Sequence, residues 1–408
     1  MSNFKYYIYR FFSELIPIYP LYLIMFDKNG LSVAQISWLL AIWSVPGVIL
    51  EIPTGILADR WSRRGMLLLG RLLIAVCYLV WIFADGFGMY ALGFVLWGIG
   101  GTFNSGSEEA LLYDSMKQAN RVEGFERVLG RGRFLSGIST VLASIFGGYL
   151  GMRYGFTPVL FLSVISALIG AGTVFSVKEV NLYKDRLVLE KREREEKTLQ
   201  RALSFLLTRK EILLYSLLSL VVISSAGILD EYDQLIAEGF GLSIAFIGGW
   251  TAVRFILIAL GGYLAPAIRK GIERIFRQKD RMLQVAVLCC LAAGALLAAG
   301  LVRSIGVMAL YGLYYLIMAA GEVLHEDYIQ QRIDEEGRST VHSLISLGQS
   351  LYGILCYGLF GWLVSETDLF VGLIWTGVYI VLWTLLLCAF YRKWRRGNER
   401  HSLSEESC

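Results

Sequence analysis

The sequence predicts an all-α integral membrane protein with twelve transmembrane helices, arranged as two pseudo-symmetric six-helix bundles. First, 56% of the 408 residues are hydrophobic, whereas a soluble domain has about 45–50%. Second, only 18% of the residues are charged, and they gather in short intervals between long apolar runs. Third, the runs are about 20 residues each, the length at which a helix crosses the ~30 Å hydrocarbon layer.

The apolar runs define the expected helices in chain order. They cover residues 6–26, 36–58, 66–84, 89–115, 133–152, 156–177, 211–236, 243–268, 282–302, 305–330, 342–364 and 369–391. The first run is too long for a signal peptide and has no small-residue cleavage site, so we expect a spanning helix there. Pro17, Pro20, Pro46 and Pro53 can break or bend the first two helices.

The basic residues predict that both termini are cytoplasmic. An even number of spans places the two termini on one side. With that side inside, the outer loops contain only Lys28, Arg153 and Arg303 of the 38 Lys and Arg, and Arg71 and Arg254 lie within helices. The remainder fall on the inner side, as basic loops do in membrane proteins.

The longest interval between runs divides the chain into six plus six helices. We expect an N-terminal bundle at 1–178, a charged linker at 179–210, a C-terminal bundle at 211–392 and a cytoplasmic tail at 393–408. In the linker, the pairs Glu190/Arg194 and Glu193/Lys197 have the i,i+4 spacing that supports a solvated helix. The halves also resemble each other weakly, with Phe146–Leu150 matching Phe360–Leu363. Two such repeats around a midplane cavity are typical of transporters.

The turn from Gly55 to Gly65, between the second and third runs, is short and strongly charged. Its glycines allow a close helix approach or a tight bend, and its three arginines suit the cytoplasmic side. Asp59, at the end of a helix, can pair with these arginines or face the positive N-terminus of another helix.

This turn resembles the signature loop of the major facilitator superfamily. The matching residues, in order, are Gly55, Leu57, Ala58, Asp59, Arg60, Arg63 and Arg64, and Ser62 stands where a glycine is usual. The resemblance implies a gating role: Asp59 would contact the inner end of the eleventh helix, and Arg60 and Arg64 would bridge toward Asp114.

The run from Ser105 to Asp114 resembles a subgroup of small bacterial permeases classed as drug or metabolite exporters. The fifth-helix exporter motif is partly present, through Gly130, Gly147 and Gly148, and the fourth-helix arginine motif is absent.

Many ionisable residues fall inside the predicted helices, where each charge costs at least ~2.5–3.5 kcal/mol. They are Glu14, Glu51, Arg71, Glu108, Glu109, Asp114, Asp230, Glu231, Asp233, Arg254, Glu322, His325, Glu326 and Asp327. Because acids greatly outnumber bases, some carboxylates must be protonated, face water or await a cation. This is the chemistry of a proton-coupled carrier.

Two sets of acids are candidates for a central cavity. In the fourth run, Asn104/Glu108 and Ser105/Glu109 stack at i,i+4; in the tenth, Glu322, His325 and Glu326 are expected on one face. Glu109 and Glu322 are the first candidates to line the cavity. The alternative is that Glu108, Glu109 and Glu326 pair with cytoplasmic-end arginines, namely Arg131, Arg133 and Arg338, and lock the inner gate. For Asp114 the gate role is favoured.

Three further positions are open to two interpretations each. Asp230, Glu231 and Asp233 either attract cations or cap the outer rim. Arg254 either pairs with one of these acids or binds an anionic substrate. Glu14 follows Arg10 by one helical turn, so it either pairs with Arg10 or forms a first-helix proton site.

The sequence therefore predicts a secondary active transporter that exports small amphiphilic or cationic compounds, with protons as the coupling ion. The alternatives are a proton-coupled uptake symporter or an exchanger, and, from another class, a membrane-embedded sensor or enzyme. No nucleotide loop, nucleophile motif or metal-ligand set occurs in the sequence, and Glu322-x-x-His325 alone is a weak metal signal. We expect no enzymatic activity, no cofactor, no metal and no nucleic-acid partner, and a monomer in the bacterial plasma membrane.

Overall fold

The computed structural model describes residues 1–105, 107–180, 208–277, 279–330 and 338–405, and these are helical with no strand. The helices of the first half are α1 (Asn3–Glu14), α2 (Tyr22–Lys28), α3 (Val33–Arg60), α4 (Arg63–Ile82), α5 (Phe87–Asn104), α6 (Ser107–Gln118), α7 (Phe125–Tyr154) and α8 (Phe156–Phe175). Those of the second half are α10 (Lys210–Gly239), α11 (Ile244–Ile275), α12 (Arg281–Val302), α13 (Met308–Gln330), α14 (Arg338–Glu366) and α15 (Leu369–Glu405). Short 3-10 turns lie at Val122–Gly124 and Ile305–Val307.

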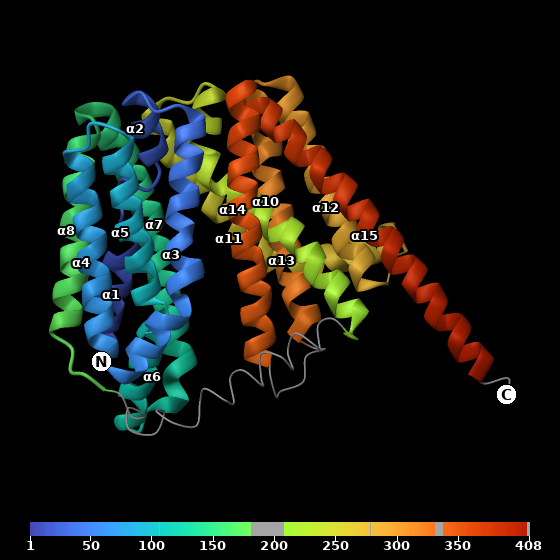
Figure 1. Ribbon diagram of the computed structural model, residues 1–408, viewed down its shortest axis with the longest axis horizontal. Helices are drawn as coiled ribbons and strands as arrows, with labels where there is room; N and C mark the ends of the chain where they lie inside the picture. Colours follow the sequence, from blue (N-terminus) through green and yellow to red (C-terminus); the bar gives the residue numbers. More distant parts are fainter. Residues whose placement is uncertain (106, 181–207, 278, 331–337, 406–408) are drawn as a thin grey trace. The chain divides into compact units, whose positions relative to one another are not determined.

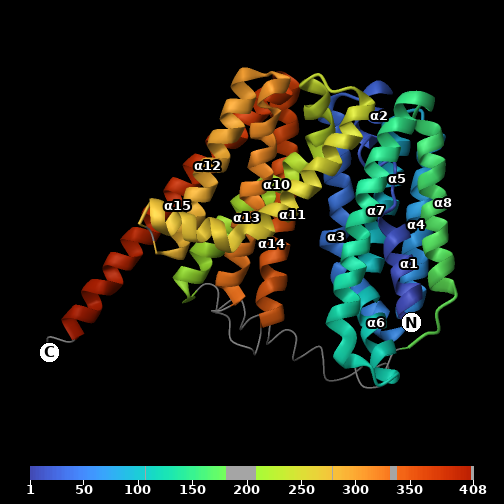
Figure 2. The same cartoon turned by 180° about the vertical axis from the view of Figure 1, so that it is seen from behind.

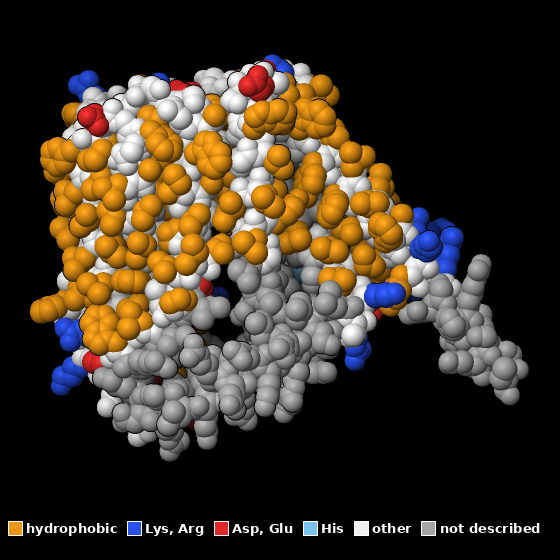
Figure 3. Space-filling view, in the orientation of Figure 1, with side chains coloured by type: hydrophobic (Ala, Val, Ile, Leu, Met, Phe, Trp, Pro, Cys, Tyr) orange, Lys and Arg blue, Asp and Glu red, His pale blue; other side chains and the backbone are white. Residues whose placement is uncertain are grey.

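The prediction of an all-α membrane protein is confirmed. Within the described residues, eight helices are long and apolar enough to cross a membrane. Hydrophobic side chains cover most of the face seen in Figure 3, and Lys, Arg, Asp and Glu gather toward the helix ends. The count of twelve spans and the cytoplasmic termini stay predictions. Of the linker at 179–210, residues 181–207 lie outside the described part of the chain, and with them the two predicted i,i+4 pairs.

The helices form two compact units. The first contains Met1–Glu193, Tyr232–Phe255 and Tyr357–Glu366, and the second contains Arg194–Glu231, Ile256–Cys356 and Thr367–Cys408. In the first unit, α4 packs against α5 and α8, and α1 packs against α7 and α8 (Figure 1). In the second unit, α12 packs against α13 and α15 (Figure 2). The predicted domain boundaries stay predictions.

Two of the twelve expected runs are each broken into two helices. The first run ends as α1 at Glu14 and resumes as α2 at Tyr22, and Pro17 and Pro20 lie in the gap. A proline lacks the N–H that continues a helix, so two of them in seven residues explain the break. The fourth run breaks between Asn104 and Ser107, a break that its apolar pattern did not predict. The second run does not break, because α3 is continuous through Pro46 and Pro53.

An aromatic cluster anchors α2 within the first unit. Trp81 packs edge-on against Phe26 and Phe94 with ring centroids 5.1 Å apart in both cases, and it stacks on Tyr22 at 6.1 Å. A Cβ atom at Gly93 would lie 2.0 Å from Trp81 Nε1, so a glycine is needed for α5 to approach this ring. The short helix α2 is therefore held by buried rings rather than by its own length.

Candidate functional site

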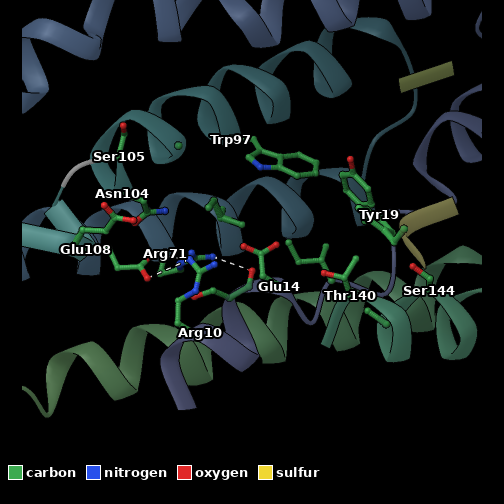
Figure 4. A pocket seen from close by; sticks show the side chains of 17 residues that line it. Arg10, Glu14, Tyr19, Arg71, Trp97, Asn104, Ser105, Glu108, Thr140 and Ser144 are labelled. Carbon is green, nitrogen blue, oxygen red and sulfur yellow. Dashed lines mark hydrogen bonds and ion pairs between the residues drawn. The ribbon is translucent and has the colours of Figure 1, made fainter. Parts of the chain in front are cut away.

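A pocket of about 550 Å³ lies in the first unit (Figure 4). Its walls come from α1, the segment after it, α4, α5, α6 and α7, with Phe255 from α11. The lining residues are Arg10, Ser13, Glu14, Ile16, Tyr19, Arg71, Ile74, Trp97, Gly101, Asn104, Ser105, Glu108, Glu109, Thr140, Ala143, Ser144 and Phe255. Glu108 and Asn104 lie at one end of the cavity and Tyr19 and Ser144 at the other. The pocket therefore joins the two helix breaks.

The end of α1 is held by side chains from three other helices. The last carbonyl oxygens of a helix lack helical N–H partners, and in a membrane they need others. Four consecutive carbonyl oxygens accept from side chains here: Arg10 O from Ser136 Oγ (3.4 Å), Phe11 O from Ser139 Oγ (2.5 Å), Phe12 O from Ser166 Oγ (2.9 Å) and Ser13 O from Arg71 Nη1 (3.1 Å). Phe11 O also accepts from the backbone N–H of Leu15 at 3.1 Å. The sequence pattern predicts no role for the serines of α7, for Ser166 or for Arg71 as a cap.

Glu14 is the last residue of α1 and lines the pocket. Figure 4 shows it across the cavity from Trp97. The expected ion pair of Glu14 with Arg10 is not formed, because the Arg10 guanidinium instead contacts both carboxylate oxygens of Glu108 at 3.1 Å. Within the described part of the chain, the Glu14 carboxylate accepts no hydrogen bond and forms no direct ion pair, whereas its backbone carbonyl accepts from Ile16 N at 2.9 Å. Arg71, the other base of the pocket, is engaged by Ser13 O and by the Tyr9 hydroxyl.

Glu108 and Glu109 both line the pocket, and each also pairs with an arginine. Glu109 pairs with Arg133, one of the predicted partners, whereas Glu108 pairs with Arg10 instead of Arg131, Arg133 or Arg338, and the cavity and gate roles of both stay predictions. Arg133 Nη2 lies 3.1 Å from Glu109 Oε1, and these side chains are 66% and 54% exposed. The predicted i,i+4 stacking with Asn104 and Ser105 assumed a continuous helix, and the break between α5 and α6 removes it. Asn104 Oδ1 is instead buried without a hydrogen-bond partner.

The charged turn closes the opposite end of α4 from the aromatic cluster. Arg63, not Arg64, reaches Asp114: Nη1 lies 2.5 Å from Oδ2, with side chains 8% and 2% exposed. Arg64 donates to Phe175 O at 2.6 Å, so its expected bridge to Asp114 is wrong. The register follows from Ser62, which caps α4 by accepting from Gly65 N at 2.7 Å and thereby turns Arg63 inward.

The remaining residues of the turn with a predicted role are Gly55, Asp59 and Arg60. A Cβ at Gly55 would meet no atom within 4 Å among the described residues, so a close helix approach there is absent from this structure. The side chains of Asp59 and Arg60 lie outside the described part of the chain. Their gating roles stay predictions.

Arg254 pairs with an acid of α10, which was one of the two predicted alternatives. Its Nε lies 3.1 Å from Asp233 Oδ2, with side chains 2% and 1% exposed. Trp250 Nε1 donates to Asp233 Oδ1 at 2.9 Å. Asp230 and Glu231 are half-buried, in the second unit and outside the pocket.

In the second unit, α13 is continuous through Glu322, His325 and Glu326, so their predicted i, i+3, i+4 spacing is kept, but their surroundings differ. His325 is 3% exposed, stacks on Tyr215 at 5.1 Å and contacts Tyr215 O through Nε2. Glu322 and Glu326 are exposed and do not line the pocket of the first unit. Among the described residues there is no group of three or more His, Cys, Asp and Glu that could hold a metal ion.

Comparisons with known proteins agree on the family. The family model for the Major Facilitator Superfamily matches residues 6–355. An uncharacterized MFS-type transporter, YxaM, of Bacillus subtilis (strain 168) is 21% identical over an alignment of 384 residues, which covers 91% of each of the two chains. The crystal structure of the nucleoside transporter NupG has a TM-score of 0.77 and 14% identity, covering 96% of this chain and 99% of that one. The D-xylose-proton symporter has a TM-score of 0.67 and 14% identity, covering 94% and 95%.

Proposed function

Because this chain belongs to the major facilitator superfamily, and is thus a multi-pass membrane transporter rather than an enzyme, we propose that it exports small cationic or amphiphilic molecules in exchange for protons. The pocket of the first unit would be part of the substrate site, reached alternately from the two sides of the membrane. We further propose a monomer in the plasma membrane with both termini cytoplasmic, as the basic loops indicate.

One observation carries this proposal: the Glu14 carboxylate lines the pocket at the end of a half-helix and, within the described part of the chain, forms no direct ion pair, because Arg10 pairs with Glu108 and Arg71 donates to Ser13 O. The guanidinium groups of Arg10 and Arg71 still attract this carboxylate from a longer distance. The C-terminal end of a helix carries a partial negative charge, so a carboxylate placed there favours a cation. Half-helix ends of this kind bind coupling ions in transporters. Aromatic rings of Trp97, Tyr19 and Phe255 add surfaces on which an organic cation can lie.

Exchange would follow from competition at Glu14. A proton bound to the carboxylate neutralises it and removes its attraction for an organic cation; loss of that proton restores the attraction. Proton and substrate would therefore occupy the site in turn, as antiport requires. Glu109 and Arg133 would tune the pocket mouth, and Glu322 and Glu326 of the second unit remain candidate coupling acids.

A second candidate is proton-coupled uptake of an uncharged polar solute. It is favoured by the fold likeness to a nucleoside transporter and a D-xylose-proton symporter. The buried polar atoms without partners in the pocket, Asn104 Oδ1, Ser13 Oγ and Ser144 Oγ, could bind hydroxyl or amide groups of such a solute. Here Glu14 would carry the proton in the same direction as the solute.

Proteoliposomes with an imposed pH gradient test both proposals. Organic cations, nucleosides and sugars are supplied one at a time, and proton and solute fluxes are recorded together. Counterflow of protons against a cation, lost in Glu14→Gln and kept in the exposed control Glu366→Gln, supports export. Flow of protons together with a nucleoside or sugar supports the second candidate. Cation flux that is unchanged in Glu14→Gln contradicts the role of the pocket.

A further inference from the structure

The buried side chain of Gln234, on α10, lies between two backbone groups of the segment from Tyr19 to Leu23, which includes the start of α2. Gln234 is 4% exposed; its Oε1 accepts from Leu23 N at 3.0 Å, and its Nε2 donates to Tyr19 O at 2.8 Å. Residues 19 and 23 are four apart, so their C=O and N–H are the pair that would bond each other in a continuous helix. The glutamine amide is thus inserted into a missing helical hydrogen bond.

We propose that Gln234 is a positioning residue and that the segment from Tyr19 to Leu23 switches between two states, one hydrogen-bonded to the Gln234 amide and one hydrogen-bonded to itself. With the amide inserted, α2 begins at Tyr22. With the amide withdrawn, Tyr19 O and Leu23 N bond directly and extend α2 by two residues toward its N-terminus. Tyr19 then becomes the N-cap and Pro20 the first helical residue, which is the helix position that proline favours.

Both states satisfy the backbone, which makes the switch possible inside a membrane. An unpaired buried backbone group costs roughly 1–3 kcal/mol, so simple removal of the glutamine would be disfavoured. The direct bond between Tyr19 O and Leu23 N removes that cost. The element therefore has two discrete arrangements rather than a continuous range, as conformational switches require.

While the Gln234 amide is inserted, α10 and α14 also contact the chain close to α2. This is the end of the first unit away from the N-terminus (Figure 1). Tyr232, two residues before Gln234, donates its hydroxyl to Ser37 Oγ of α3. A Cβ at Gly361 of α14 would lie 2.0 Å from that same Ser37 oxygen. Lys28 and Glu238 form an ion pair at 3.1 Å. Gln234 is thus one of several contacts that draw α10 and α14 onto the first half of the chain.

The switch is linked to the substrate pocket through Tyr19. The carbonyl of Tyr19 bonds Gln234, and Tyr19 itself lines the pocket (Figure 4). Making Tyr19 the N-cap of α2 would reorient this residue. Opening of the α2 end and the change in the pocket wall would then occur together.

The test is accessibility of a pocket cysteine from each side of the membrane, without substrate or pH gradient, so its outcome is independent of the proposed function. Thr140→Cys, in a background with the six native cysteines replaced, reports labelling by an impermeant maleimide. Gln234→Leu should raise the labelling rate from the α2 end about tenfold, equivalent to about 1.4 kcal/mol of closed-state stabilisation, and lower it from the other side. Gln234→Glu keeps the acceptor for Leu23 N and should give a smaller change.

Gln284→Leu is the matched control, since Gln284 is fully buried in α12 of the second unit. Equal labelling in Gln234→Leu and the unsubstituted reporter overturns the proposal, as does a rise from both sides, which would mean general loosening. So does an equal rise in the Gln284 control. If Gln234→Leu does not fold, Gln234→Glu alone decides: no change in its labelling ratio between the two sides contradicts the switch.

Discussion

The guanidinium of Arg63 lies 2.5 Å from the carboxylate of Asp114, and the two side chains are 8% and 2% exposed. The pair joins the start of α4 to α6, the helix that follows the break after α5. Arg63 Nη1 also donates to Ala110 O at 3.3 Å. A buried pair of this kind matters most when one partner is removed, because the other charge is left without compensation.

Asp114→Asn should therefore destabilise the protein strongly, by about 3–5 kcal/mol. The measurement is thermal unfolding in detergent. The exposed pair Arg133–Glu109 provides the control, and Glu109→Gln should cost at most about 1 kcal/mol. Similar melting temperatures for the two variants would contradict a structural role for the Arg63–Asp114 pair.

Arg71 is expected to be needed for the shape of the pocket rather than for its charge alone. Arg71→Met removes the donor to Ser13 O and the contacts to the Tyr9 hydroxyl, so the end of α1 loses a cap and Glu14 loses its fixed position. We expect substrate binding to weaken at least tenfold, measured by equilibrium binding to purified protein. Arg71→Lys keeps the positive charge but not the guanidinium geometry, and binding as tight as in the wild type would contradict this argument.

The sequence predicted the helices well and their breaks and partners poorly. Apolar runs of about 20 residues are enough to identify spanning helices, and two prolines marked the first break. No such residue pair marked the break after Asn104. Arg63 replaced Arg64 as the partner of Asp114 because the N-cap at Ser62 sets the rotation of α4. A one-residue register of this kind depends on turn geometry, which spacing alone does not reveal.

Glu14 and Gln234 show that contacts between distant segments at the site could also not be predicted from residue spacing. The spacing of Arg10 and Glu14 suggested a pair on one helix, but the packing of α1 turns Arg10 to Glu108 of α6. Gln234 lies 211 residues from Leu23, and an uncharged side chain that bonds backbone has no sequence signature. Contacts between distant segments follow from the assembled fold.

Asp368 lies between α14 and α15, outside the membrane-spanning segments, and its carboxylate makes a pH-dependent contribution to stability. Burial alone would raise the pKa of this carboxyl, but the N–H of Val371 and the Arg303 guanidinium at 2.8 Å hold the pKa below the ordinary value of 3.8. A depressed pKa adds stability above the unfolded-state value and loses it as pH falls through the folded-state value. Because both side chains are over 40% exposed, the contribution is at most about 1 kcal/mol.

Asp368→Asn should accordingly lower the melting temperature at pH 7 by a few degrees at most, and the difference from the wild type should shrink below about pH 4. Melting curves in detergent across this range check the sign. A difference that is constant with pH would show that the Asp368 carboxylate acts only through packing.

Two adjacent glycines of α11 offer a matched test of closure at the α2 end. A Cβ at Gly248 would lie 2.0 Å from Ser144 O and 3.0 Å from Gly148 Cα on α7, whereas a Cβ at Gly249 would meet no atom within 4 Å. Backbone cannot yield as a flexible side chain can, so Gly248→Ala must push α11 away from α7, at a cost of about 1–3 kcal/mol. Gly249→Ala changes helix propensity by the same amount without the clash. In the Thr140→Cys reporter, Gly248→Ala should raise labelling from the α2 end several-fold and Gly249→Ala should not, and equal rates in the two variants would mean that the α7–α11 contact does not hold this end closed.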